Sequence, residues 1–129
     1  MNVVLDSWAV LRFLEDDGAV ADEVDSLLAE GRPVVSWINL GEVQYVLRRQ
    51  VGESAASATV RDLEVALDAR LPDRPMVLAA ARIKADHPMA YADAFAAALA
   101  QSLGATLWTG DPELLIDGAP WSHRDLRPR

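Results

Sequence analysis

The chain has 129 residues, of which 51% are apolar, so it is long enough to bury one hydrophobic core. It has no Cys and only two His residues, which excludes disulfides, thiolate metal sites and a cysteine nucleophile and leaves oxygen ligands for any metal ion. The net charge of −8 argues against nucleic-acid binding by bulk electrostatics, but not against a metal-dependent enzyme, because bound cations neutralise a site locally.

Short apolar runs alternate with amphipathic segments along the chain. In chain order the patterns predict a strand over 3–5, helices over 7–14 and 19–30, a strand over 33–36, helices over 39–49 and 54–68, a weak strand over 69–71, helices over 75–86 and 89–103, a strand over 105–109, a turn into a last helical turn at 110–112, an edge strand over 120–122 and a tail over 124–129. This alternation predicts an α/β fold in which helices cover both faces of a parallel sheet.

No repeat, low-complexity tract or linker interrupts this pattern, so we expect a single domain over residues 1–129. The apolar start meets Asp6 almost at once and has no basic residues before it, unlike a secretory signal peptide. No apolar run approaches the length of a membrane span. We therefore expect a cytoplasmic protein without a membrane partner.

Four acidic residues occupy comparable places in this pattern. Asp6 and Asp111 follow directly on predicted strands, whereas Glu42 and Asp93 lie in the early turns of predicted helices. In a parallel sheet the carboxyl ends of the strands and the amino ends of the following helices share one edge, so all four carboxylates can converge there. Unpaired carboxylates would repel one another, and a divalent cation removes that cost.

Each acid also has a purely structural explanation. Asp6 and Asp111 are suitable helix N-caps, the latter before Pro112, and Glu42 can close a capping box with Asn39. Asp93 lies near the positive end of its helix, where the dipole favours an acid. Asp93 is nevertheless the only charge in an Ala-rich helix that is expected to be buried, which favours a functional role for it.

The motifs that contain these acids resemble the PIN-domain ribonucleases, and among them the VapC-type toxins of bacterial toxin–antitoxin pairs. The matching segments are Val4-Leu5-Asp6-Ser7, Trp37-Ile38-Asn39-Leu40-Gly41-Glu42-Val43, the run from Tyr91 to Ala100, and Thr109-Gly110-Asp111-Pro112. Each segment is loose, but together they follow the order of the family across nearly the whole chain. One departure is Ala90, where many relatives place a Ser that would cap the helix.

The resemblance implies a PIN-like three-layer α/β/α fold with a parallel sheet of about five strands. It implies that Asp6, Glu42, Asp93 and Asp111 form the catalytic site and hold Mg²⁺, with Mn²⁺ as a substitute, and that Ser7 and Thr109 support them. The expected activity is metal-dependent hydrolysis of RNA phosphodiester bonds, in which the metal activates water and stabilises phosphate charge. The expected partners are RNA, a VapB-type antitoxin and a second copy of the chain in a homodimer.

Two other functions fit parts of the pattern. A phosphoacceptor receiver domain also gathers acids at strand ends, but it needs a Lys at a late strand end, and the one Lys of this chain, Lys84, falls in a predicted helix. A non-catalytic PIN-like module would act mainly by binding an antitoxin partner or RNA. An acidic cleft attracts Arg side chains, so such binding is compatible with either role.

Overall fold

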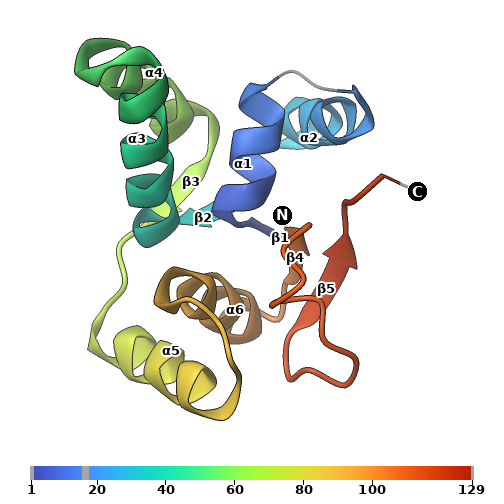
Figure 1. The fold of residues 1–129 in the computed structure, drawn as a ribbon. Coiled ribbons are helices and arrows are strands. Elements are labelled where there is room, and N and C mark those ends of the chain that lie inside the picture. Colours follow the sequence, from blue (N-terminus) through green and yellow to red (C-terminus); the bar gives the residue numbers. More distant parts are fainter. Residues whose placement is uncertain (1, 16–17, 129) are drawn as a thin grey trace.

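The computed structural model describes residues 2–15 and 18–128, in which short strands alternate with helices (Figure 1). The elements in chain order are β1 (Val3–Leu5), α1 (Ser7–Leu14), α2 (Gly18–Glu30), β2 (Val34–Ser36), α3 (Trp37–Val51), α4 (Glu53–Ala66), β3 (Asp68–Arg70), α5 (Arg74–Asp86), α6 (Tyr91–Leu103), β4 (Thr106–Thr109) and β5 (Ser122–Asp125). None of the described helices is long and apolar enough to cross a membrane.

The five strands form one parallel sheet in the order β3-β2-β1-β4-β5. The chain first builds outward from β1 through β2 to β3, and then returns to the other side of β1 with β4 and β5. The strand order therefore reverses between β1 and β4, where Leu5 is paired with Trp108. In open parallel sheets such a reversal opens a crevice at the carboxyl ends of the strands, and ligands bind there.

Alternate residues of the central strands pack into two cores, one on each face of the sheet. Val4, Val34 and Leu107 face α5 and α6, whereas Leu5, Val35 and Trp108 face α1 to α4. Figure 1 shows these two helical layers on opposite sides of the sheet. The three-layer α/β/α architecture and the parallel five-stranded sheet predicted from the sequence are confirmed.

Helix α6 is the most deeply buried helix because its side chains are small. Every residue from Asp93 to Ala100 is buried, and five of these eight residues are Ala. Small side chains let a helix lie close against a sheet with no room for water between them. An acid in this helix is therefore placed inside the molecule, beside the edge of the sheet.

The structure differs from the sequence-based prediction at three places. Helix α3 begins at Trp37, with Ser36 as its N-cap, and not near Asn39. The expected helical turn after Pro112 is a non-helical turn in the described chain. The last strand is Ser122–Asp125 and not 120–122, so Arg124 and Asp125 belong to the sheet and not to a tail; residue 129 of that tail lies outside the described residues.

Candidate metal centre

Asp6 is both a helix cap and a buried acid. It directly follows β1 and caps α1, where its Oδ1 accepts a hydrogen bond from the amide of Ala9 at 2.9 Å. Its other oxygen, Oδ2, accepts a hydrogen bond from the hydroxyl of Thr109 at the end of β4. The side chain is 1% exposed. The N-cap explanation is thus correct for one oxygen, while the second oxygen faces the neighbouring strand end at the point where the strand order reverses.

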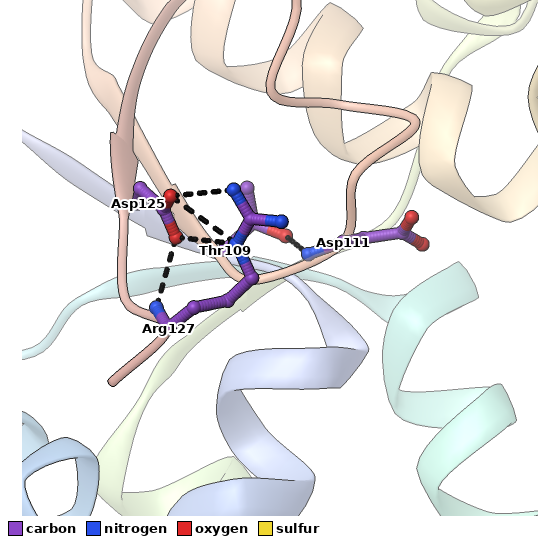
Figure 2. Close-up of polar contacts among 4 residues, drawn as sticks. All are labelled: Thr109, Asp111, Asp125 and Arg127. Carbon is purple, nitrogen blue, oxygen red and sulfur yellow. Dashed lines mark hydrogen bonds and ion pairs between the residues drawn. The ribbon is translucent and has the colours of Figure 1, made fainter. Parts of the chain in front are cut away.

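Thr109 also sets the position of Asp111. The Thr109 hydroxyl accepts a hydrogen bond from the Asp111 amide at 2.9 Å, and the Asp111 Oδ1 accepts one from the amide of Glu113 at 3.0 Å. Asp111 therefore shapes a tight turn and caps no helix. Figure 2 shows its carboxylate pointing away from the ion pair between Asp125, the last residue of β5, and Arg127.

Glu42 is held by side chains from two helices. Its Oε1 accepts hydrogen bonds from the hydroxyl of Ser7 at 2.8 Å and from the side-chain amide (Nδ2) of Asn39 at 3.2 Å. Because Ser36 is the N-cap of α3, Glu42 lies too far along the helix to complete a capping box. Asn39 is fully buried and also donates to the carbonyl of Ala92, which joins α3 to the first turn of α6.

Asp93 is the third residue of α6 and is 6% exposed. One carboxylate oxygen each from Asp93, Asp111 and Glu113 lie within 4.8 Å of one another. Sequence reasoning included the first two of these and missed Glu113. Glu113 lies two residues beyond Asp111, in a segment predicted to be helical, so nothing in the pattern indicated that it turns back toward α6.

Asp6 and Glu42 lie outside that close group of three but act on it electrostatically. Burial raises the pKa of Asp6 to about 7, against the hydrogen bonds from Thr109 and Ala9, and the charges of Asp111 and Glu42 add to the rise. The pKa of Asp93 is also raised, first by burial and then by the charge of Asp111, with which it would share a proton. The four predicted acids therefore interact as one site.

This arrangement fits a divalent cation. The donor set is made of carboxylate oxygens, which hard cations such as Mg²⁺ and Mn²⁺ prefer. Without a cation, burial favours the protonated forms of Asp6 and Asp93 near neutral pH, and the charges of neighbouring acids add to this. A bound cation would replace those protons. Buried Asn39 adds a further polar atom, because its Oδ1 has no hydrogen-bond partner among the described residues.

Comparison with protein families matches residues 3–116 to the PIN domain. The chain belongs to the PIN-domain family. Solved structures of similar architecture include VapBC2 of Rickettsia felis bound to a promoter DNA fragment, with a TM-score of 0.79, 14% identity and coverage of 98% of this chain and 100% of the other. A comparison with curated proteins found no match.

Two further solved structures share the PIN fold. VapBC-1 of nontypeable Haemophilus influenzae has a TM-score of 0.76 and 20% identity, and the match covers 97% of this chain and 98% of the other. VapC20 of Mycobacterium tuberculosis, a toxin that cleaves the sarcin-ricin loop, has a TM-score of 0.71 and 18% identity over 90% of this chain and 95% of the other. At these identities the likeness establishes a common fold.

The PIN assignment leaves no support for the receiver-domain alternative. Lys84 lies in α5, and its ammonium group donates a hydrogen bond to the carbonyl of Met89 at 2.7 Å. It therefore holds the connection between α5 and α6 and does not project from a strand end. PIN domains are nucleases, and the acidic cluster of this chain is consistent with a metal site of that class.

Proposed function

We propose that this PIN-domain protein is a Mg²⁺- or Mn²⁺-dependent endoribonuclease that acts as the toxin of a toxin–antitoxin pair in the cytoplasm. The observation that supports the proposal is that Asp6, Glu42, Asp93 and Asp111 influence one another electrostatically beside the reversal of strand order, with Asp93 and Asp111 in one close group of carboxylates. Three of these acids come from segments separated by dozens of residues, and two of them hold protons near neutral pH. Buried carboxylates without a cationic partner destabilise the fold, so a purely structural role does not explain why so many lie together here.

In this proposal Asp6, Glu42, Asp93 and Asp111 hold the metal ion, directly or through water. When bound, the ion supplies a nucleophile near neutral pH and stabilises charge on the phosphate. The chain contributes a fixed ligand geometry. Thr109 orients Asp6 and the turn that presents Asp111, while Ser7 and Asn39 orient Glu42. Such hydrogen bonds to ligating carboxylates hold them ready for the ion and tune their basicity.

The proposed substrate and partners extend the same reasoning. RNA is the proposed substrate, and one protein with this fold, VapC20, cleaves the sarcin-ricin loop. Several proteins with this fold occur with a VapB antitoxin, so we propose a VapB-type antitoxin as the partner here. A partner Arg would be attracted to this group of carboxylates. We also propose a homodimer.

The test is Mn²⁺-dependent cleavage of RNA by the purified protein and by Asp6→Asn and Asp93→Asn variants. Each variant keeps the shape of the side chain and removes its charge. We expect both to remain folded by circular dichroism and to lose cleavage by at least about a hundredfold, since carboxylate ligands are replaced. Asp117→Asn, an exposed acid of the β4–β5 connection, is the matched control and keeps full activity. Full cleavage by either site variant would contradict the assignment.

A non-catalytic module that acts through an antitoxin or RNA is the second candidate, because an acidic cleft can bind a basic peptide without any chemistry. It becomes the better account if the purified protein neither binds Mn²⁺ in a calorimeter nor cuts any cellular RNA. Mapping of newly formed RNA ends after induction, with Asp93→Asn as control, would identify the target in the catalytic case.

A further inference from the structure

Glu113 connects two segments that each carry an acid of the site. Its backbone amide donates a hydrogen bond to Oδ1 of Asp111 at 3.0 Å. Its side-chain Oε2 accepts a hydrogen bond from the backbone amide of Ala90, the N-cap residue of α6, also at 3.0 Å. Glu113 thus fixes the turn after β4 to the beginning of the helix that presents Asp93.

The beginning of α6 has no cap of its own. Ala90 stands at the N-cap position and has no side chain that can accept a hydrogen bond from the first turn. In many helices the acid at the third position reaches back to the N-cap amide and satisfies it. That position is occupied by Asp93 in α6. Glu113 takes the Ala90 amide instead, so the Asp93 carboxylate is free to face Asp111 and the metal site.

A second contact shows that Glu113 has a distinct role in this region. The connection between α5 and α6 is also held by Lys84, whose ammonium group binds the carbonyl of Met89. Lys84 lies in α5, so that contact ties the connection to its own preceding helix. The Glu113 contact ties it to the turn after β4, across 23 residues of sequence.

We propose that Glu113 is a positioning residue of the metal site, which accepts the N-cap amide of α6 and thereby fixes Asp93 relative to Asp111. The proposal rests on the proposed metal-dependent function. In the positioning role the Glu113 side chain acts as a hydrogen-bond acceptor, and its negative charge is dispensable. If Glu113 were itself a ligand, as its distance of at most 4.8 Å from both acids would permit, its charge would be essential.

The variants Glu113→Gln and Glu113→Ala separate these roles. Gln keeps a carbonyl oxygen that accepts the Ala90 amide, whereas Ala removes the acceptor. Asp117→Ala is the matched control, because it removes an exposed acid from the same connection at the same cost in net charge. For each protein we would measure Mn²⁺ affinity by calorimetry, the melting temperature without metal, and hydrogen exchange at the Ala90 amide.

Glu113→Ala is expected to weaken Mn²⁺ binding about tenfold, as loss of a group that orients a ligand commonly does, and to speed exchange at Ala90 roughly fivefold. Its melting temperature is expected to fall by roughly 3 °C. Glu113→Gln should bind Mn²⁺ within about threefold of the parent, because one orienting contact remains. Its metal-free melting temperature should equal or exceed that of the parent, since one of three close acids has been neutralised.

Two results would overturn the proposal. Equal loss of Mn²⁺ affinity in the Gln and Ala variants would show that the charge binds the metal, and unchanged affinity in the Ala variant would show that the contact is idle. Exchange at Ala90 is measured without metal, so it tests the cap even if the parent protein binds no Mn²⁺. Failure of the proposed function is thereby distinguished from failure of this inference.

Discussion

Thr109 donates its hydroxyl hydrogen to Asp6 across 103 residues of sequence. The contact exists because β1 and β4 are neighbours at the centre of the sheet, with Leu5 opposite Trp108, so that both strands end at the same level. The same hydroxyl accepts the amide of Asp111. One side chain therefore sets the relative position of two acids that reach the site from opposite ends of the chain.

Replacing Thr109 with Val keeps the volume of the side chain and removes both hydrogen bonds. Because Asp6 and Thr109 are buried, we expect a loss of about 1–3 kcal/mol in the free energy of unfolding, measured by urea denaturation. The pKa of Asp6 should rise further, since the Thr109 hydroxyl lowers it. Mn²⁺ affinity should fall by about 10–100-fold. Thr109→Ser, which retains the hydroxyl, should preserve the affinity; equal affinity in the Val variant would contradict this role.

The metal-free protein should become less stable as the pH rises from about 4 to about 7. The folded-state pKa of Asp6 is raised from 3.8 to about 7, so in this window the folded state holds a proton that the unfolded state has released. Stability falls with rising pH wherever the folded state binds more protons. At 1.36 kcal/mol per pKa unit the effect of Asp6 is at most roughly 4 kcal/mol.

Urea denaturation in the presence of a chelator, at several pH values, measures this dependence. Saturating Mn²⁺ should reverse it, because deprotonated carboxylates bind the cation and binding to the folded state adds stability. Asp6→Asn serves as the control and should make the metal-free profile less steep, leaving the contribution of Asp93. Stability of the metal-free protein that rises between pH 5 and 7 would contradict the burial of an uncompensated Asp6.

The sequence predicts the central part of this fold well because its signals there are local. The β-branched run before Asp6 predicts a strand, and the Ala-rich segment around Asp93 predicts a helix, each from a few neighbouring residues. β5 carries no such signal. Its residues Ser122–Asp125 are all polar or charged, and the strand is held by its pairing with β4. The next residue, Leu126, is buried and anchors the end of the strand in the core.

The parts of the site that the sequence does not predict depend on tertiary contacts. A capping box at Asn39 is a sound local interpretation, but Ser36 caps α3 one turn earlier and leaves Asn39 to join Glu42 with α6. The role of Glu113 cannot be predicted from the local sequence for the same reason, since its partner Ala90 lies in another segment. The roles of the four acids as ligands remain predictions, which the variants proposed above test.

Asp93→Asn should stabilise the metal-free protein at pH 8 while it abolishes metal binding. The carboxyl of Asp93 is buried near other acids, so ionisation is costly there and the neutral amide avoids that cost. We expect a larger gain at pH 8 than at pH 5, because at pH 5 the folded-state carboxyl is protonated and carries no charge. Thermal unfolding at both pH values measures this. A variant that is less stable than the parent at pH 8 would contradict the cost assigned to Asp93.

Gly110 lies between Thr109 and Asp111 because no larger residue fits there. A Cβ at this position would lie 2.2 Å from Cζ2 of Trp8, and Arg12 lies on the Trp8 ring, with its Cζ 5.0 Å from the ring centroid. Gly110→Ala must therefore displace the ring or the turn, and we expect a loss of about 1–3 kcal/mol in the free energy of unfolding, measured by urea denaturation.

The control is Gly41→Ala, within α3, where the added Cβ meets nothing within 4 Å and should stabilise the helix by about 0.5–1 kcal/mol. Because the added Cβ would displace the turn that presents Asp111, Gly110→Ala should also bind Mn²⁺ more weakly by calorimetry, whereas Gly41→Ala, whose Cβ meets nothing, should not. Equal stability of Gly110→Ala and the parent would show that Trp8 moves aside freely and that this close contact does not determine the turn.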